Sequence, residues 1–564
     1  MATRGHHDSE GNFIQLLRLR AEDNPLLQTL IENGRYLSPE IVNEQISLIG
    51  QNILRHLLDS VKTSKWYSVM ADECMDVSYE EQLVICVRWV DSDLQIHEDM
   101  LGLLKIESQT SNYITAAIKD ILLRCGLPLE LCRGQAYDGA PNMSGHLSGV
   151  AKQIQDQSPS ALGVHCLAHC INLCVQDVTK KCQPVRDSMD LVIEIEKLIC
   201  LSPKRSNLFL EQKQLHGSAG SPNLRPICPT RWTVRTYAIE SVLKNYKVLQ
   251  ETLDNIHKNT RDEYSRRAGG QLAMMDKFST FFGLKLSHLI FAASEQLSLS
   301  VQGKETSAHD ANKAAKATES YFERQRQESV FNKFYESVID EAKDLTDPPT
   351  LPRYRRIPKR VDDGTEQHRF DTVKGYYRQQ YYEALDLAKG ELNARFDQKN
   401  MSVVQEIEAL LLSAANGEDV SIPSSVADLY KNDISLGSLE TQLKLLPGIF
   451  KDDDSKIKIK RVTLIDTIST YMLRSEANKR LLSDVYSLLK IYLTIPVTTA
   501  TAERAFSSLR RIKTYLRSTM TQARLNHCML GYVHKELTDN VDVKEIASNF
   551  IKKFPLRQVF FGNV

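Results

Sequence analysis

The fold of this chain is indicated by residues 66–105, WYSVMADECMDVSYEEQLVICVRWVDSDLQIHEDMLGLLK. The stretch contains three short apolar runs, Val69–Ala71, Leu83–Val87 and Met100–Leu104, which are separated by polar turns. Short apolar runs of this kind are typical of strands, and the short connections between them predict antiparallel neighbours. We therefore expect a three-stranded antiparallel sheet in this part of the chain.

Helices and one more strand are predicted after these three strands. We expect a helix around Asn112–Cys125, a fourth strand leading into Asp138, and helices over Ser144–Gln155 and His165–Val178. Three strands, a helix, a strand and a helix are the order of an RNase H-like core. The expected fold class is therefore mixed α/β, with an RNase H-like core.

The remaining sequence is predicted to be almost wholly helical, because its apolar residues recur at helical spacing. We expect four regions. They are an N-terminal helical segment over residues 1–65, the first part of the core over 66–233, a large all-helical insertion over 234–479, and the C-terminal part of the core over 480–564.

The composition limits the possible partners. Of the 564 residues, 42% are hydrophobic and 25% are charged, as in ordinary globular proteins. The 71 Lys and Arg residues balance 71 Asp and Glu residues, so a nucleic-acid surface is expected only as a local patch. No run of about 18 apolar residues is present, so no membrane partner is expected. The 11 scattered cysteines favour reduced thiols in a cytosolic or nuclear protein.

Three acidic residues stand far apart in the sequence, each in an informative context. Asp72 ends the apolar run Trp66–Ala71, Asp138 joins a strand end to a turn at Gly139, and Glu503 opens a helix. If the three meet in space, they can hold two Mg²⁺ ions about 3.5–4 Å apart, which is the arrangement used for phosphoryl transfer. Each alone has an ordinary interpretation: a solvated turn, an Asp-Gly turn, and a first-turn glutamate favoured by the helix dipole.

The segment Cys166-Leu167-Ala168-His169 places metal-ligating residue types at helical spacing. A structural zinc ion normally needs four ligands in two such pairs, and no matching distant pair is evident in the sequence. We therefore expect buried thiols, with His169 facing the crevice, and no structural zinc. A zinc site that also uses the nearby Cys170 and Cys174 is the alternative.

One aromatic residue and three basic runs are candidates for contact with nucleic acid. Trp232 can anchor the core, or it can stack on an extruded base while Arg231 contacts a phosphate. The basic runs are compatible with phosphate contacts, although charge runs are usually solvated faces. They comprise Arg510, Arg511, Lys513 and Arg517; Lys456, Lys458, Lys460 and Arg461; and Arg353, Arg355, Arg356, Lys359 and Arg360.

Taken together, these motifs resemble those of hAT-superfamily transposases. Within that superfamily the chain is most similar to the vertebrate transposase-derived group that includes MYM-type zinc-finger proteins. The resemblance extends over nearly the whole chain. It rests on five motifs in the expected order, namely Ala71-Asp72-Glu73-Cys74-Met75-Asp76-Val77-Ser78, Tyr137-Asp138-Gly139-Ala140-Pro141-Asn142-Met143, Cys166-Leu167-Ala168-His169, Thr230-Arg231-Trp232 and Thr501-Ala502-Glu503-Arg504-Ala505-Phe506-Ser507-Ser508-Leu509.

The resemblance implies an RNase H-like core that is split by a helical insertion and followed by a C-terminal dimerisation segment. It implies that Asp72, Asp138 and Glu503 bind Mg²⁺ or Mn²⁺, and that Cys166 and His169 support the active site.

The resemblance also implies DNA and a second copy of the chain as partners, in the nucleus. Trp232 would lie near a flipped base during hairpin formation on flanking DNA. From their own charge, and not from the resemblance, Arg231, Arg510 and Arg511 are expected to contact DNA.

One departure from the family pattern bears on function. The family usually starts with a zinc finger, whereas no Cys/His pair of that kind precedes Asp72. We therefore expect a truncated or domesticated product. Two functions stay open, a transposase core that cleaves and transfers DNA strands, and a catalytically silent dimer that acts through protein contacts, for example in transcriptional regulation. An RNase H-type nuclease acting on RNA is a third, which the late Glu503 and the large insertion disfavour.

Overall fold

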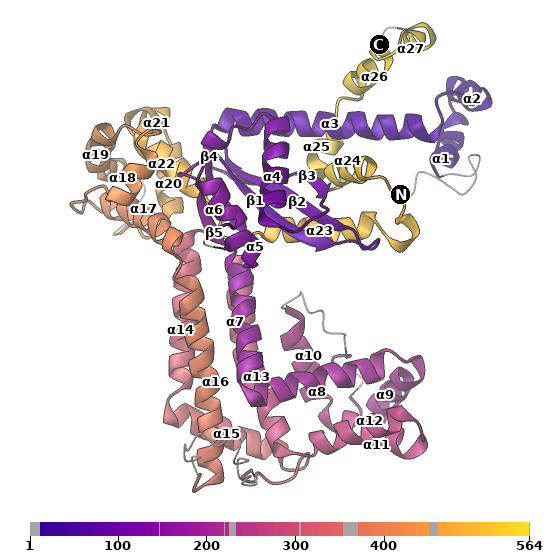
Figure 1. Cartoon of the computed structure of the whole chain (residues 1–564), viewed down its shortest axis with the longest axis vertical. Coiled ribbons are helices and arrows are strands. Elements are labelled where there is room, and N and C mark those ends of the chain that lie inside the picture. The colour runs from indigo at the N-terminus through magenta and orange to yellow at the C-terminus, as the bar shows by residue number, and fades with distance from the viewer. Residues whose placement is uncertain are drawn as a thin grey trace. The chain divides into compact units, whose positions relative to one another are not determined.

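The chain divides into two compact units (Figure 1). The computed structural model describes residues 12–145, 147–218, 220–224, 233–303, 306–352, 370–450 and 461–562. Residues 1–166 and 403–564 form one unit, which we name the sheet unit. Residues 167–402 form the other, which we name the helical unit.

The sheet unit contains five strands in the order β3-β2-β1-β4-β5. β2 pairs antiparallel with both β1 and β3, whereas β4 is parallel to β1 and β5 is parallel to β4. The three predicted antiparallel strands and the fourth strand are confirmed, and with them the mixed α/β, RNase H-like fold class. The strands are β1 (Tyr67–Met75), β2 (Glu81–Val90), β3 (Ile96–Lys105), β4 (Cys132–Tyr137) and β5 (Leu162–His165).

The last strand, β5, was not predicted from the sequence. His165 ends this strand, and the following helix, α7 (Leu167–Lys181), begins two residues later than predicted. With four residues, β5 is too short for an alternating pattern to separate it from a helix.

The helix predicted over Ser144–Gln155 is wrong, because two short helices occupy this stretch. They are α5 (Pro141–Ser144) and α6 (Val150–Gln155). Gly145 and Gly149 lie between them in a tight turn, where a Cβ added to Gly149 would stand 2.5 Å from the backbone nitrogen of Gly145. The close approach of these two backbones interrupts the helix.

Helices cover both faces of the sheet. Successive residues of a strand point to opposite faces, and the two apolar clusters of the unit follow this alternation. One cluster contains residues of α3 (Pro39–Ser64), α4 (Ser111–Cys125) and α6. The other contains Met70 and Ala136 of the strands together with α23 (Ala500–Ile512) and α24 (Gln522–Val533). Figure 1 shows α23, from the yellow end of the chain, lying along the indigo strands.

Both ends of the chain add further helices to the sheet unit. Beyond β5, the part of the chain that the structure describes contains helices and no further strand. The additional elements are α1 (Asn12–Ala21), α2 (Pro25–Glu32), η1 (Leu129–Leu131), α17 (Lys399–Ala415, mostly in this unit), α18 (Ser424–Tyr430), α19 (Leu436–Leu445), η2 (Leu446–Phe450), α20 (Ile465–Leu473), α21 (Glu476–Leu481), α22 (Ser483–Thr494), η3 (Tyr515–Arg517), α25 (Lys535–Asp539), α26 (Val543–Lys552) and α27 (Pro555–Phe561).

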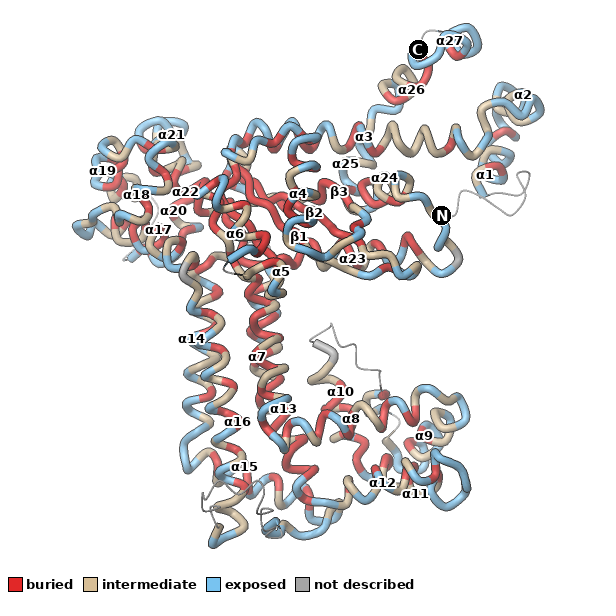
Figure 2. The backbone as a smooth tube through the Cα atoms, in the orientation of Figure 1, coloured by how far each residue is buried: buried red, intermediate tan, exposed pale blue. Residues whose placement is uncertain are grey.

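The helical unit has an apolar core of its own, which Figure 2 shows as buried stretches on its helices. Aromatic rings contribute to this core, for example Phe278 and Phe282, whose centroids lie 5.1 and 4.8 Å from that of Tyr377. Its remaining helices are α8 (Gln183–Cys200), α9 (Pro203–Leu215), α10 (Thr233–Lys244), α11 (Tyr246–Asn259), α12 (Glu263–Met275), α13 (Phe278–Val301), α14 (Ala308–Gln325), α15 (Glu328–Ala342) and α16 (Val373–Phe396).

The boundaries of the helical unit differ from the predicted insertion over residues 234–479. The unit begins at Leu167 and ends at Ser402. It begins earlier because α7, α8 and α9 contribute Val175, Val192 and Phe209 to its core. It ends earlier because α18 to α22 belong to the sheet unit.

Two expectations from the composition, reduced thiols and no membrane-spanning helix, can be compared with the structure. None of the cysteines within the described residues forms a disulfide. None of the described helices combines the length and the apolar character needed to cross a membrane.

Gly50 of α3 provides a test of how the two ends of the chain pack. A Cβ on Gly50 would stand 3.2 Å from the Cα of His527 on α24. Gly50→Ala should therefore destabilise the sheet unit by about 1–3 kcal/mol, although Gly→Ala in an open helix gains about 1 kcal/mol. Denaturant unfolding followed by the fluorescence of the buried Trp66 and Trp89 measures the change.

Gly531→Ala is the matched control, because a Cβ at Gly531 makes only an ordinary contact, 3.8 Å from Thr538 Oγ1. This variant should be neutral or more stable. Equal stability of the two variants would contradict the packing described here.

Candidate active site

The ends of two neighbouring parallel strands place Asp72 and Asp138 side by side. In the register of β1 and β4, Val69 pairs with Gln135 and Met70 pairs with Ala136. Two residues further along each strand stand Asp72 and Asp138. Since residues two apart point to the same face, both acids lie on the face of Met70 and Ala136. This is the face that α23 covers.

Helix α23 brings Glu503 to the same face. Its apolar stripe, which includes Ala502, Ala505 and Leu509, packs on the strands. At about 100° per residue, Glu503 stands at one edge of this stripe. The opposite edge carries Thr501, which bonds to Glu98 on β3, so the edge with Glu503 faces β1. The late position of Glu503 in the sequence is therefore compatible with a place beside the strand-end acids.

Two of the three acids, Asp72 and Glu503, have raised pKa values. Burial, with the charges of Asp138 and then Glu503, raises the pKa of Asp72 well above its ordinary value. Burial also raises the pKa of Glu503, against the opposing charge of Arg504. All three residues are partly buried. Carboxylates from the two ends of the chain thus lie on one face of the sheet, where the neighbouring acids disfavour the ionised form of Asp72.

A fourth acid, Glu73, follows Asp72 in β1, and strand alternation points its side chain to the opposite face of the sheet. Burial, followed by the charges of Asp138 and Glu81, raises its pKa to about 7. Its Oε1 accepts a hydrogen bond of 3.4 Å from the Asn142 side chain. We did not single out Glu73 from the sequence, although the Asp72-Glu73 doublet was the available signal.

The donor set of the site suits a hard divalent cation. Its ligand atoms are carboxylate oxygens, which Mg²⁺ and Mn²⁺ prefer to the sulfur and nitrogen ligands of zinc sites. Within the described residues, no group of three or more His, Cys, Asp or Glu side chains is placed so that it could hold a metal ion. The three acids lie on one face of the sheet, but their side chains do not form such a group.

Cys166 connects the strand of Asp138 to the start of the Glu503 helix. Its backbone N–H donates to the carbonyl of Tyr137 at 2.9 Å. Its buried Sγ accepts from the backbone N–H of Thr499 at 3.3 Å. Cys166 therefore supports the geometry of both elements. His169 lies in the first turn of α7, in the helical unit.

The basic residues of α23 have different environments. Arg510 stands two turns after Glu503, on the same side of the helix, and it is exposed next to Cys74. Arg511 is also exposed and donates to the hydroxyl of Tyr532 at 3.1 Å. These two residues are available to a phosphate backbone.

Lys513 corrects the expectation of a solvated basic run. Its side chain is 1% exposed, and its Nζ lies 2.6 Å from Asp76 and 3.0 Å from Glu80. The β1–β2 turn supplies both acids, so Lys513 anchors the C-terminal end of α23 to the sheet and is not available for phosphate contact.

Other predicted DNA contacts lie outside the described residues. They are Arg231 and Trp232, the run over residues 353–360, and Lys456, Lys458 and Lys460. Arg461, which the structure does describe, forms an ion pair with Glu418 at 3.2 Å.

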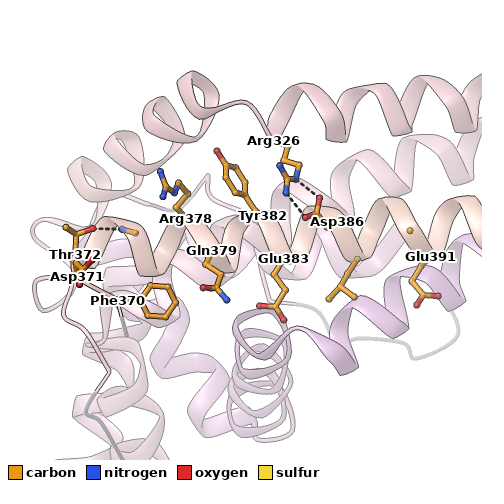
Figure 3. A pocket seen from close by; sticks show the side chains of 13 residues that line it. Arg326, Phe370, Asp371, Thr372, Arg378, Gln379, Tyr382, Glu383, Asp386 and Glu391 are labelled. Carbon is orange, nitrogen blue, oxygen red and sulfur yellow. Dashed lines mark hydrogen bonds and ion pairs between the residues drawn. The ribbon is translucent and has the colours of Figure 1, made fainter. Parts of the chain in front are cut away.

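The helical unit contains a cavity of about 910 Å³ along α16 (Figure 3). Charged side chains line it, but its arginines are paired: Arg326 with Asp386 at 2.6 Å and Arg378 with Glu328 at 3.2 Å. It contains none of the acids of the candidate site. Because its arginines are already paired with acids, this open groove offers no evident binding chemistry.

Three segments of the chain match protein-family models. Residues 1–149 match the model described as "ZMYM1/FAM200, RNase-like domain". Residues 164–276 match the "ZBED1 RNase-like helical domain". Residues 476–537, which include α23 and Glu503, match the "hAT family C-terminal dimerisation region".

Two mammalian proteins are similar to this chain over most of its length. The Homo sapiens "52 kDa repressor of the inhibitor of the protein kinase" is 21% identical over 571 residues, which cover 96% of this chain and 72% of that protein. The Mus musculus protein of the same name is 22% identical over 579 residues, covering 95% of this chain and 73% of that protein.

The raised pKa of Asp72 predicts a pH-dependent gain of stability on Asp72→Asn. The unfolded pKa is about 3.9, so the folded chain holds this proton to higher pH. The ionised carboxyl therefore destabilises the fold increasingly as the pH rises from about 4 to the folded pKa, and has no such effect below that window. In metal-free protein at pH 8, Asp72→Asn should raise stability on the order of 1 kcal/mol, or the melting temperature by about 2–4 °C.

Thermal unfolding with a chelator, at pH 8 and at pH 4.5, measures this effect. The gain should shrink at the lower pH. Asp120→Asn is the control, because Asp120 is an exposed residue paired with Arg124. A gain for Asp72→Asn that is independent of pH would contradict the electrostatic explanation.

Proposed function

Because this chain is a hAT-derived, transposase-like protein, we propose that its acidic site cleaves and transfers DNA strands by metal-dependent phosphoryl transfer. Asp72, Asp138 and Glu503 are the proposed metal ligands. The observation that carries the proposal is that the register of β1 and β4 and the packing of α23 bring the three acids to one face of the sheet. Acids that are distant in the sequence would have little reason to gather in a partly buried place unless a cation used them.

Each ligand has a defined role in this proposal. Asp72 and Asp138 hold their carboxylates on adjacent strands, which gives the site a rigid base. Glu503 closes the site from α23, on the face that covers these strand ends. A pair of Mg²⁺ or Mn²⁺ ions, when bound, supplies the activation of the attacking oxygen and the stabilisation of the leaving oxygen.

The proposed substrate is DNA, and the proposed location is the nucleus. Arg510 and Arg511 are exposed on the helix that carries Glu503 and can contact phosphates. Arg510 stands on the Glu503 side, so it can orient the strand that is cleaved. Arg231 and Trp232 keep their proposed roles as a phosphate contact and a stacking surface for a flipped base.

A second candidate function is that of a domesticated, catalytically silent dimer that regulates transcription through protein contacts. Two observations favour it. The two mammalian relatives are named as repressors. Residues 476–537 match a dimerisation region, which supports self-association.

Asp138→Asn tests the enzymatic proposal. The substitution removes one proposed ligand charge but keeps the size of the side chain. It should lower Mg²⁺- or Mn²⁺-dependent nicking by more than about 100-fold, because changes in the outer shell of a metal site alone cost about 10–100-fold. Nicking is measured on supercoiled plasmid DNA and on duplexes carrying any terminal inverted repeats that flank the gene.

Asp120→Asn makes the same chemical change at an exposed position and should leave nicking unchanged. If wild-type protein cleaves none of these DNAs with either metal, the enzymatic proposal is rejected and the regulatory dimer is favoured.

Tyr515→Asp tests self-association. Tyr515 is 83% exposed and lies within the matched dimerisation region. The wild-type chain should sediment at twice the monomer mass, and a charge at Tyr515 should shift it toward the monomer, because charges are disfavoured at the core of an interface. Tyr113→Asp is the control, since Tyr113 is 39% exposed and lies on α4, which covers the opposite face of the sheet. A monomeric wild-type chain would rule out the dimer.

A further inference from the structure

A buried ion pair lies on the face of the sheet that α23 covers, apart from the acidic cluster. Arg88 of β2 and Glu98 of β3 stand directly opposite each other in the antiparallel register. Arg88 Nη1 lies 2.8 Å from Glu98 Oε1, and the two side chains are 4% and 3% exposed. A buried ion pair is weak evidence for stability, because desolvation offsets most of the attraction. The role of this ion pair is therefore better explained by the segments that it connects.

The pair binds the chain on both sides of the turn over residues 495–499. On one side, Arg88 Nε donates to the carbonyl of Leu493 at 3.0 Å, near the end of α22. On the other side, Glu98 Oε2 accepts a hydrogen bond from the hydroxyl of Thr501, in the first turn of α23. Arg504 Nη2 lies 3.5 Å from the same oxygen of Glu98.

Thr501 and Glu503 stand on opposite edges of the apolar stripe of α23. At about 100° per residue, the two side chains are separated by about 200° around the helix axis. The buried Ala502 lies between them in the sequence and faces the strands. Thr501 reaches Glu98 on β3, at the edge of the sheet, while Glu503 influences Asp72 on β1. A rotation of α23 that lifts Thr501 away from β3 therefore also displaces Glu503.

We propose that Glu98, held in place by Arg88, is a positioning residue that sets the rotation of α23 through the hydroxyl of Thr501. In this way it places Glu503 at the acidic site without touching it. The inference rests on the proposed function in one respect, since it takes Glu503 to be a metal ligand. The apolar stripe selects the face of α23 that meets the sheet. The directional hydrogen bond from Thr501 fixes the rotation more finely within that face.

Thr501→Val is the most informative variant. It removes the hydroxyl but keeps the branched shape of the side chain and both charges of the ion pair. Glu98→Gln is less suitable, because it would leave Arg88 buried without a counter-charge and could unfold the chain. Thr501→Ser restores a hydroxyl and serves as the rescue. Thr252→Val, at a fully buried threonine whose hydroxyl bonds within its own helix, controls for the general cost of the change.

Three measurements distinguish positioning from a purely structural role. Hydrogen exchange of residues 500–506 should be at least about five-fold faster in Thr501→Val than in Thr252→Val, as expected for a helix end that has lost an anchor. The affinity for Mn²⁺ should fall by about ten-fold. The kcat for nicking should fall by about 10- to 100-fold, as expected for a misplaced catalytic group, while KM for DNA stays within about two-fold. Thr501→Ser should recover most of each loss.

Each outcome decides the inference. If Thr501→Val matches Thr252→Val in hydrogen exchange, or if Thr501→Ser is as defective as Thr501→Val, Glu98 does not position α23 through the hydroxyl. If wild-type protein binds Mn²⁺ but does not nick DNA, the enzymatic proposal fails while exchange and Mn²⁺ affinity still decide the positioning role. If it binds no Mn²⁺ either, Glu503 is not a ligand and the inference is overturned.

Discussion

The docking of α23 on one face of the sheet is the constraint on which the acidic site depends. An apolar stripe selects the face of a helix that packs on a sheet, and directional polar contacts fix the rotation more finely. Directional contacts act near both ends of α23. Thr501 donates to Glu98 near the N-terminal end, and the buried Lys513 lies 2.6 Å from Asp76 just after the C-terminal end. Such contacts add little net stability, so their main consequence is geometric.

Two acids on this face of the sheet, Asp76 and Asp72, have pKa values shifted in opposite directions. Asp76 is paired, and although burial raises its pKa, Lys513 and backbone N–H groups more than offset that effect and lower it overall. At the acidic site, burial and the neighbouring acids act in the same direction and raise the pKa of Asp72. A sequence selected for stability alone would pair or separate these acids. Local conflicts of this kind mark functional sites in otherwise consistent folds.

The sheet unit is assembled from the two ends of the chain, because residues 167–402 form a separate unit between them. That helical unit has its own apolar core, so its own folding holds its two ends. The loop that joins the two parts of the sheet unit is therefore effectively shorter than its 167–402 range. A large insertion is therefore compatible with a site that needs Glu503 beside Asp72. The region over 476–537 thus contains both Glu503 and the segment that matches the dimerisation model.

The sequence by itself determined the features that depend on neighbours along the chain. Short apolar runs separated by polar turns located β1 to β3, and the strand-end context identified Asp138 as a candidate. Only the tertiary structure decided what depends on distant partners. It buried Lys513, which the sequence pattern grouped with solvated arginines, and it paired Glu98 with Thr501, although neither stood out in the sequence. The physical reason is that local propensity acts over a few residues, whereas burial and pairing are set by segments that meet only in the folded chain.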